Sequence, residues 1–517
     1  MKVQDRVEQS EGSAAAGDGA ALDPAAAREA HDVLAGRPTR LDGLLRPGAR
    51  FRVPVTPATL HALESLHLLA AERGARIDLA PAEGLDAREE GFLEDFRLRF
   101  LNEAIATADG PGPLTDDALS YARSLAGLAV SGGLPRARLT VPARLGSAVL
   151  IGAYGGDHVG DAAILGGVLL GLHRDHGITR ACILSQRPAH TARLAAALET
   201  PVEVSVRPYD YATLRDELGR SDALAFAGGP LMDLPRMLVK HLAAARMARA
   251  ARKPFLICRV GVGPFSRRIS AWTARLIASH ADRLSVRTSG AARHPVLRGL
   301  QVETGRDPAF DYLESRKSLT RLTGAEQASV ERLLAGTEGR VLIGLNIRPI
   351  RHEWSQQGKD FSRDAEEAFN RRLAEAMATV AAAAPRPVTW VFFPMNPIQL
   401  GSSDLAAAWR LHSLVGARAD LRVWEADPDV DGVLHLLRRL DGAVAMRFHA
   451  AIFCLSQGVP TIGIDYYPGQ GGKVEQLFHD FGLDDDVRRI DTADADWMRD
   501  RLARLAGAPL GVRKVNS

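Results

Sequence analysis

The clearest signal of the fold is the stretch Asp441-Gly442-Ala443-Val444-Ala445-Met446-Arg447-Phe448-His449, together with residues 450–467 after it. Its apolar run ends in Arg-Phe-His, and small residues typical of a buried helix then occupy positions 450–457. A second apolar run covers residues 460–465. The order of strand, turn, helix and strand predicts a βαβ unit with two parallel strands.

Charged side chains follow both strands of this unit. Arg447 and His449 come directly after the first strand, at the start of a helix whose N-terminus favours anions. A glycine-rich turn that ends in Lys473 follows the second strand. Because ligands of open α/β sheets lie beyond the carboxyl ends of the strands, we expect Arg447, His449 and Lys473 to face a ligand.

The same alternation of apolar runs and helical patterns extends over most of the chain. A first series of buried strands begins at Ser147 and ends near Glu303, and a second series begins at Val341 and ends at Asp465. Alternating strands and helices predict a mainly parallel sheet with helices on both faces. Two such series predict an α/β protein with two Rossmann-like doubly wound domains that face a cleft.

A chain of 517 residues is too long for a single core and divides into several parts. The expected parts are a disordered tail (1–28), a mainly helical accessory region (29–143), the first Rossmann-like domain (144–313), a connecting helical segment (314–339), the second Rossmann-like domain (340–490), and a C-terminal helix and tail (491–517). Within the accessory region, amphipathic patterns predict helices over 58–73, 89–107 and 116–130, and residues 51–55 fit a short strand.

The composition is that of an ordinary soluble globular protein, and its net charge of +3 is small for this length. This balance gives no reason to expect nucleic acid as a partner. Cys182, Cys258 and Cys454 lie within apolar patterns and form no C-x-x-C pair, which indicates buried thiols rather than disulfides or a zinc site. No apolar run is long enough to span a bilayer and no secretory signal is seen, so we expect a cytoplasmic protein.

Seven motifs occur in one order over residues 147–483. They are the opening turn Gly152-Ala153-Tyr154-Gly155 to Gly160-Asp161, the second turn Ala227-Gly228-Gly229-Pro230 with Asp233, the segment Arg259-Val260-Gly261-Val262-Gly263-Pro264, the element Leu284-Ser285-Val286-Arg287-Thr288-Ser289, the segment Asp307-Pro308-Ala309-Phe310, the triplet Arg447-Phe448-His449, and the turn 466–473 that ends in Lys473. Together they resemble the motifs of the polysaccharide pyruvyl transferases. The first 140 residues are not covered by this resemblance.

The chain departs from the family pattern at three places. Asp157-His158-Val159 stands where the family commonly has asparagine before the first Gly-Asp pair, and Pro230 replaces a third glycine. The turn before Lys473 is enlarged by residues 468–472. These departures concern the identity of the acceptor more than the chemistry of the donor.

The resemblance implies a GT-B-like arrangement of the two domains, with phosphoenolpyruvate as donor and a pair of sugar hydroxyls as acceptor, joined as a pyruvate ketal. It implies no cofactor besides this donor substrate and a saccharide or lipid-linked saccharide as partner. The expected role is polysaccharide or cell-envelope glycan biosynthesis. Contact with the inner face of the membrane and assembly into a homo-oligomer both stay open.

The chemistry of phosphoenolpyruvate agrees with the residues at the strand ends. Its carboxylate and phosphate require several fixed cations, and arginine binds both groups by paired hydrogen bonds. His449 is the expected general acid, because the pKa of histidine lies near neutral pH and nearby anions keep the ring protonated. We therefore expect His449 and Arg447 to be catalytic. The residues expected to bind substrate are Arg348, Arg287, Lys473, Gly155, Gly160, Asp161, Gly228, Gly229 and Asp233.

Two other functions fit the same pattern. A GT-B glycosyltransferase would grip the ribose of a nucleotide sugar, for which Glu475 after the glycine-rich turn is suitably placed. A non-catalytic binding module would keep only the fold, although it would be free to lose Arg447 and His449. The density of arginines at strand ends favours a small trianionic donor over a nucleotide sugar.

Purely structural roles are also open for the individual candidates. Arg447 could pair with Asp441 or Asp465 at the surface, and Lys473 could simply begin a solvated helix. Asp161 could cap a helix that starts at the next residue. The glycine-rich turns could be tight turns without a ligand.

Overall fold

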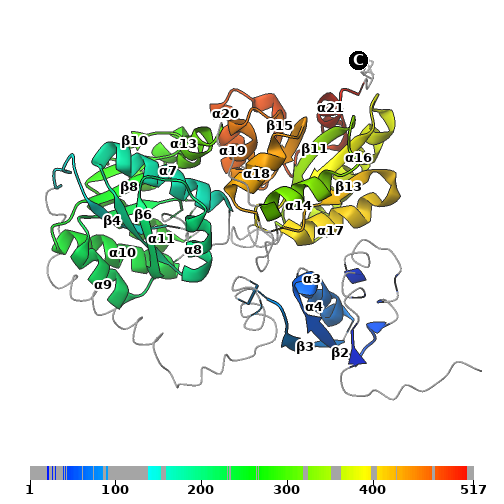
Figure 1. Cartoon of the computed structure of the whole chain (residues 1–517), viewed down its shortest axis with the longest axis horizontal. Coiled ribbons are helices and arrows are strands. Elements are labelled where there is room, and N and C mark those ends of the chain that lie inside the picture. Colours follow the sequence, from blue (N-terminus) through cyan, green and yellow to red (C-terminus); the bar gives the residue numbers. More distant parts are fainter. Residues whose placement is uncertain are drawn as a thin grey trace, which may run out of the picture. The chain divides into compact units, whose positions relative to one another are not determined.

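The computed structural model describes residues 138–508 except for 153–158, 230, 232–234, 264, 266, 318–323, 351–362, 397–403, 427 and 468–471. It also describes residues 45–60, 62–73, 75–85 and isolated positions between residues 20 and 93. The chain forms two compact units, Met1–Ala104 and Ile105–Ser517 (Figure 1).

The first unit contains a small parallel sheet and two short helices. The strands are β1 (Ala20–Ala21), β2 (Arg50–Val55) and β3 (Arg76–Ala82), in the order β1-β2-β3, and the helices are α3 (Pro57–Leu60) and α4 (Leu63–Glu72). The predicted strand over 51–55 is confirmed, and the helix predicted over 58–73 forms as two pieces. The hydroxyl of Thr59 in α3 donates to the carbonyl of Pro54 in β2 at 2.6 Å, which ties the first piece to the strand.

Two expectations for this unit differ from the structure. The sheet was not part of the expected mainly helical region, and the expected disordered tail overlaps β1, where Ala20 pairs with Phe51. Two alanines carry no strand pattern of their own, so only this tertiary pairing reveals them. Most of segment 89–107 and all of segment 116–130 lie outside the described residues.

The second unit begins with a seven-stranded parallel sheet in the order β10-β9-β8-β7-β4-β5-β6. Its strands are β4 (Ser147–Ile151), β5 (Arg180–Ser185), β6 (Glu203–Pro208), β7 (Ala223–Ala227), β8 (Phe255–Val260), β9 (Arg283–Val286) and β10 (Glu303–Thr304). The helices of this half are α7 (Val159–His176), α8 (Pro188–Ala196), α9 (Tyr211–Arg220), α10 (Pro235–Ala250), α11 (Arg268–His280), α12 (Ser289–Ala292) and α13 (Pro308–Ser315). The strand order reverses between β4 and β7, as in a Rossmann fold.

The second half of this unit repeats the arrangement with six parallel strands in the order β13-β12-β11-β14-β15-β16. The strands are β11 (Val341–Asn346), β12 (Val388–Phe392), β13 (Asp420–Val423), β14 (Gly442–Ala445), β15 (Thr461–Asp465) and β16 (Val487–Arg489). The helices are α14 (Gly324–Leu334), α16 (Arg363–Ala383), α17 (Asp404–Val415), α18 (Val430–Leu437), α19 (Phe448–Ser456), α20 (Lys473–Asp480) and α21 (Ala495–Ala506). The predicted pair of Rossmann-like domains is confirmed.

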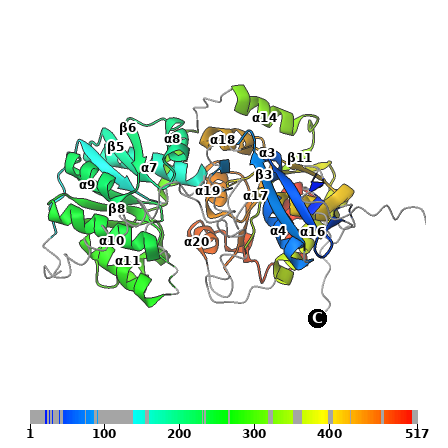
Figure 2. The same ribbon diagram turned by 90° about the horizontal axis from the view of Figure 1, so that it is seen from below.

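Alternate residues of the first sheet enter two separate cores. On β4, Val149 and Ile151 pack on the face covered by α9, α10 and α11, whereas Ala148 and Leu150 pack on the opposite face with α7, α8 and α13. The core on the α7 face continues without a break into the other half, because α13 packs against α19 and α7 packs against α18. Figure 2 shows α7 and α18 at this junction. The two halves therefore share one apolar core.

A buried ion-pair cluster lies at the junction between the halves. Nε of Arg316 donates to Asp431 at 3.0 Å, and its other nitrogens pair with Asp431 and Glu199. Arg316 is only 1% exposed. The ring of Phe310 stacks on that of Phe481 with centroids 5.4 Å apart. The two halves are therefore joined by both charged and apolar contacts.

None of the helices in the described segments is both long enough and apolar enough to cross a membrane.

Candidate active site

The two arginines at the centre of the second sheet lie at its switch point. Strands β11 and β14 are neighbours in the sheet, with Asn346 paired to Ala445, and the strand order reverses between them. Arg348 and Arg447 each follow the end of their strand by two residues. The crevice at a switch point is where open α/β sheets bind ligands, so the topology brings both guanidinium groups to that place.

A buried carboxylate holds Arg447. Its Nε donates to Oδ1 of Asp404 at 2.6 Å, and the two side chains are 5% and 0% exposed. Oδ2 of Asp404 also accepts from the backbone N–H groups of Met395 and Asn396 and from Nδ2 of Asn346. These hydrogen bonds hold the carboxylate in place, and the carboxylate fixes the orientation of the guanidinium group.

The suggested pairing of Arg447 with Asp441 or Asp465 is wrong. Asp441 accepts from the backbone N–H of Leu342, and Asp465 accepts from those of Tyr467 and Glu475. Both aspartates therefore accept hydrogen bonds from backbone N–H groups, Asp441 at the start of β11 and Asp465 at the first turn of α20. Arg447 instead reaches a carboxylate at the start of α17.

Arg348 lies beside Arg447. Its guanidinium carbon is 5.0 Å from the centroid of the Tyr466 ring, and 8% of the residue is exposed. Burial lowers the pKa of Arg447, and the charge of Arg348 lowers it further, while Asp404 raises it. Two neighbouring guanidinium groups, one of which is paired with Asp404, suit a ligand group with more than one negative charge.

His449 occupies the first turn of α19, directly after Phe448. Burial lowers its pKa to about 4, and the charges of Arg287, Lys473 and Arg447 act in the same direction, against Asp307. The ring is therefore neutral at neutral pH in the free protein. Its Nε2 is buried and has no hydrogen-bond partner among the residues that the structure describes. Such a nitrogen is suited to exchange a proton with a bound ligand.

Gly160 allows α7 to approach this histidine. A Cβ atom at Gly160 would lie less than 3.0 Å from three atoms of His449. The N–H of Val159 donates to the carbonyl of Met395 at 3.3 Å, which ties the start of α7 to the other half. The opening glycine motif thus packs against the candidate catalytic histidine.

Arg287 reaches the site from the first half. Its Nη1 lies 2.8 Å from Oδ2 of Asp307, and its guanidinium carbon lies 4.6 Å from the centroid of the Phe448 ring. Asp307 also caps α13 by accepting from the N–H of Ala309. Gly261 leaves room for the guanidinium group, since a Cβ there would come within 2.8 Å of its Nη2.

A cavity of about 330 Å³ lies between the halves, next to Phe448. His449, Arg447 and Arg348 are not among its lining residues. Arg287 lines it from the first half and Lys473 from the second. Its other lining residues are Gly261, Val262, Gly263, Thr288, Gly290, Ala291, His294, Phe448, Tyr467, Gly472 and Gln476. Lys473 begins α20, as one interpretation suggested, but it also faces this cavity. The cavity thus combines cations with uncharged hydrogen-bonding side chains.

The remaining predicted residues are Gly155, Asp233, Gly228, Gly229 and Asp161. Gly155 and Asp233 lie outside the described residues. Gly228 has a φ of 69° and its carbonyl accepts from the N–H of Gly261, so it shapes the turn behind the cavity. Neither Gly228 nor Gly229 is among the lining residues. Asp161 is the third residue of α7 and does not cap a helix from Ala162, because the helix begins at Val159.

Three residues of the site were missed by the sequence interpretation. Asp404 and Asn346 hold Arg447, and Asp307, although quoted within a motif, was given no role. Asp307 before Pro308 carries a helix-cap signal, whereas Asp404 lies 43 positions from Arg447 and has no such signal. Within the described segments, no group of three or more His, Cys, Asp or Glu could hold a metal ion.

Comparison with solved structures finds similarities at low sequence identity. UDP-GlcNAc 2-epimerase from Neisseria meningitidis bound to UDP-GlcNAc is 12% identical, with a TM-score of 0.42, and the match covers 70% of this chain and 94% of that one. The Methanocaldococcus jannaschii UDP-GlcNAc 2-epimerase is 10% identical, with a TM-score of 0.42 and coverages of 70% and 92%. The E. coli ADP-heptose LPS heptosyltransferase II is 12% identical, with a TM-score of 0.37 and coverages of 70% and 98%.

The family comparison is more specific. No curated protein matches the chain. The profile of the family described as polysaccharide pyruvyl transferase matches residues 158–467, more than half of the chain. The matched range contains both switch-point arginines, Arg287 and His449. The chain therefore belongs to the polysaccharide pyruvyl transferase family and is a transferase.

Proposed function

We propose that the chain transfers a pyruvyl group from phosphoenolpyruvate to two hydroxyls of a saccharide, as a ketal. The observation that carries the proposal is the convergence of three cations on one histidine, with a fourth cation beside one of the three. The charges of Arg287, Lys473 and Arg447 all act on His449, and Arg348 acts on Arg447. A small ligand with a carboxylate and a phosphate matches this set better than a neutral sugar does.

The neutral state of His449 in the free protein suggests that the ring becomes protonated only when the donor binds. Its pKa of about 4 leaves the ring neutral before the donor binds. Phosphoenolpyruvate brings up to three negative charges close to the ring, and nearby negative charge raises the pKa of an imidazole. The histidine then takes up a proton together with the donor and becomes the general acid.

The proposed reaction begins when the imidazolium of His449 donates its proton to the methylene carbon. The neighbouring carbon becomes an oxocarbenium-like centre, and the first saccharide hydroxyl attacks it and returns a proton to His449. The bond from this carbon to the phosphate oxygen then breaks, and the second hydroxyl closes the ketal. The proton of the second hydroxyl leaves with inorganic phosphate. Arg447 and Arg348 stabilise the departing phosphate by hydrogen bonds and charge.

The acceptor saccharide is proposed to lie in the uncharged part of the cavity. Tyr467 offers an aromatic ring, and Thr288, His294 and Gln476 offer polar side chains. Burial lowers the pKa of His294, so its ring is neutral at neutral pH and suits hydroxyl groups. We place the reaction in polysaccharide or cell-envelope glycan biosynthesis, on the cytoplasmic side of the membrane.

Calorimetric titration with phosphoenolpyruvate, and separately with UDP and GDP, tests the donor without knowledge of the acceptor. We expect saturable binding of phosphoenolpyruvate only, and loss of this binding in Arg447→Ala. Because that variant leaves Asp404 buried without its cation, Arg447→Lys should be measured beside it. Arg418→Ala removes a half-exposed arginine of the same half and serves as the matched control.

His449→Ala is expected to bind phosphoenolpyruvate but not to turn it over. Near-normal turnover in this variant would contradict its role as general acid. Binding of UDP or GDP instead of phosphoenolpyruvate would favour the glycosyltransferase. Glu475, which was suggested to grip a ribose, does not line the cavity, and its carboxylate lies 3.9 Å from Arg489.

A further inference from the structure

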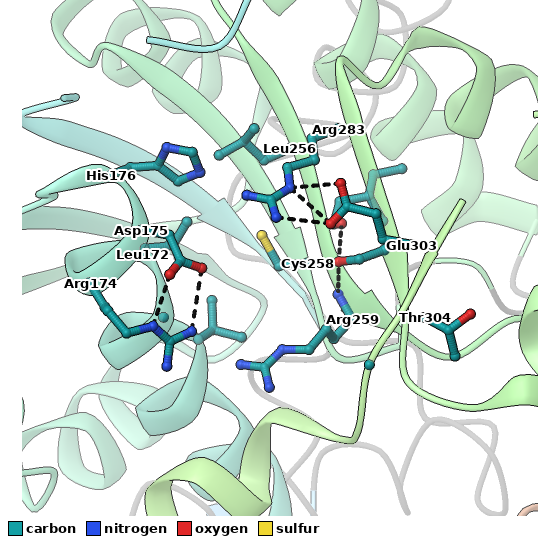
Figure 3. Close-up of a pocket in the computed structure, with 15 residues that line it drawn as sticks. Leu172, Arg174, Asp175, His176, Leu256, Cys258, Arg259, Arg283, Glu303 and Thr304 are labelled. Atoms are coloured by element: carbon teal, nitrogen blue, oxygen red, sulfur yellow. Dashed lines mark hydrogen bonds and ion pairs between the residues drawn. The ribbon is translucent and has the colours of Figure 1, made fainter. Parts of the chain in front are cut away.

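A second cavity, of about 190 Å³, lies wholly within the first Rossmann half (Figure 3). The C-terminal end of α7 forms one side of it, and residues of β8, β9 and β10 form the other. Three arginines line it, Arg174, Arg259 and Arg283, against the two carboxylates of Asp175 and Glu303. Its lining residues differ from those of the cavity between the halves, so the two cavities are separate.

Each of these arginines keeps hydrogen-bond donors for a ligand. Arg174 uses Nε and Nη2 on Asp175, and Arg283 uses Nε and Nη2 on Glu303. Among the described residues, no acceptor engages Nη1 of Arg174, Nη1 of Arg283 or Nη2 of Arg259. A guanidinium group that is held on one edge by a carboxylate can still offer its other edge to an anion.

Two of the guanidinium groups converge over a glycine of α7. A Cβ atom at Gly171 would lie 3.4 Å from Nη2 of Arg259 and 4.0 Å from Nη2 of Arg174. The two cations therefore approach the same point from different elements, Arg174 from α7 and Arg259 from β8. Like charges repel, so such a pair is most stable with an anion between them.

The backbone at Arg259 is strained where its side chain turns toward the cavity. Its φ is 47°, a left-handed conformation that costs about 1 kcal/mol or more in residues other than glycine. The strand register shifts between Ile257 and Val260, which marks a bulge. The hydroxyl of Ser285 closes the bulge, because it accepts from the N–H of Arg259 at 2.9 Å and donates to the carbonyl of Ile257 at 3.1 Å.

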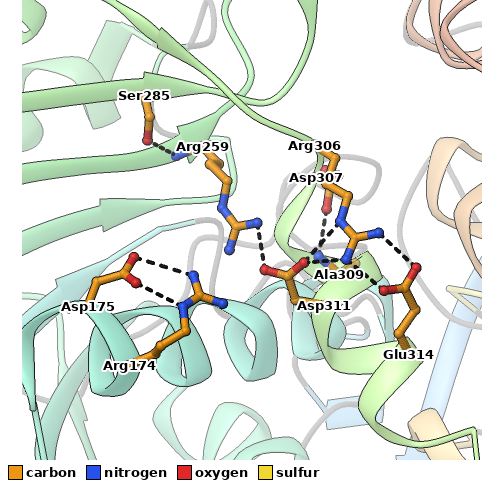
Figure 4. Close-up of polar contacts among 9 residues, drawn as sticks. All are labelled: Arg174, Asp175, Arg259, Ser285, Arg306, Asp307, Ala309, Asp311 and Glu314. Carbon is orange, nitrogen blue, oxygen red and sulfur yellow. Dashed lines mark hydrogen bonds and ion pairs between the residues drawn. The ribbon is translucent and has the colours of Figure 1, made fainter.

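A carboxylate on α13 then holds the side chain of Arg259. Nη1 donates to Oδ2 of Asp311 at 2.7 Å, and Arg306 binds the other oxygen of the same carboxylate (Figure 4). Asp311 is thus shared between two arginines, which leaves Arg259 incompletely neutralised. Backbone strain is common at ligand-binding positions. At Arg259 the strain goes together with a guanidinium group that is held in one orientation and shares its carboxylate with Arg306.

A buried histidine at the cavity is a second, independent indication of a ligand. His176 is 8% exposed and lines the cavity at the end of α7. Its Nδ1 is buried and has no hydrogen-bond partner in the described part of the chain. Buried polar atoms are nearly always paired, so a ring left in this way can turn toward a ligand.

We propose that this cavity binds a small phosphate-bearing anion. Phosphate accepts hydrogen bonds in several directions at once, which matches donors that come from α7, β8 and β9. The volume of the cavity suits a phosphate group with little attached to it. This inference does not depend on the proposed reaction.

Titration calorimetry with inorganic phosphate tests the proposal in the full chain. Arg174→Gln is the main variant, because Arg174 is 64% exposed and, among the described residues, its side chain donates hydrogen bonds to the neighbouring Asp175 alone. Arg215→Gln is its control, since Arg215 is 62% exposed and pairs with Asp216 in the same way on α9. We expect Arg174→Gln to weaken phosphate binding by about tenfold or more, and the control to bind like the wild type.

The donor site is also expected to bind phosphate, so both variants are repeated in the Arg447→Ala background. If Arg174→Gln weakens phosphate binding in that background, the result supports the second site independently of the donor site. The same affinity in Arg174→Gln and Arg215→Gln, or no phosphate binding in the Arg447→Ala background, would overturn it. Because the cavity suits a phosphate group with little attached to it, glucose 1-phosphate titrated in parallel should bind more weakly than free phosphate, and tighter binding of this ester would contradict the assignment to a small anion.

Discussion

Substitution of Gly160 by alanine would test whether α7 positions the catalytic histidine. The new Cβ would lie less than 3.0 Å from three atoms of His449, whereas ordinary contacts lie at 3.4–4 Å. Either the imidazole or the start of α7 has to move by about 1 Å to restore a normal separation. The hydrogen bond from Val159 to Met395 opposes movement of the helix, so most of the displacement should fall on the ring.

The expected cost in activity follows from this displacement. A misplacement of about 1 Å at a reacting group costs on the order of 100-fold in rate, which corresponds to about 2.7 kcal/mol of activation free energy. The expected cost in stability is about 1–3 kcal/mol, typical of an added methyl group in a packed site. Activity should therefore fall much further than the fraction of folded protein.

Release of inorganic phosphate from phosphoenolpyruvate with a saccharide acceptor measures the activity, and urea denaturation measures the stability. Gly219→Ala is the control, because this glycine lies within α9 and a Cβ there has no heavy atom within 4 Å. The reasoning would be refuted if Gly160→Ala turned over as fast as Gly219→Ala.

Three further predictions concern buried charges. Asp404→Asn leaves Arg447 buried without its counter-ion and should cost about 3–5 kcal/mol, seen as a lower urea midpoint; an unchanged midpoint would contradict the pairing. His449 has a pKa of about 4 in the free protein and a higher one beside a bound anion, so phosphoenolpyruvate binding at pH 7 should take up protons. Binding enthalpies in buffers of different ionisation heat measure this uptake, which should be absent in His449→Gln. Arg316→Met leaves Asp431 buried and unpaired and should lower the melting temperature of the second unit by the equivalent of about 3–5 kcal/mol; a temperature like that of the wild type would argue against the cluster.

Most of the second unit was predictable because buried parallel strands have an unambiguous pattern. Strands such as β7 (Ala223–Ala227) are apolar throughout and buried at every position, so their run length marks them directly. The edge strand β16 (Val487–Arg489) was missed, since a Val-Arg-Arg sequence resembles an exposed loop. Charged residues of this kind are common on sheet edges, where they discourage further pairing.

The site was predictable to the extent that topology determines it. Arg348 and Arg447 converge because each follows one of the two strands that flank the switch point, and the strand pattern is visible in the sequence. The partner of Arg447 was not predictable, because Asp404 begins α17 without any motif and lies 43 positions from Arg447 in the sequence. The neutral state of His449 was equally hidden, since it depends on burial by both halves.

The apolar core shared by the two halves also affects how the chain is made. The ribosome releases β4 to β10 before α18 and α19 exist, so the surface that α7 and α13 present to the second half stays uncovered during synthesis. Phe310, for example, has no Phe481 on which to stack until residues far downstream have emerged. We therefore expect the nascent first half to bind chaperones during synthesis. Splitting the gene between the halves would yield two fragments that depend on each other for solubility.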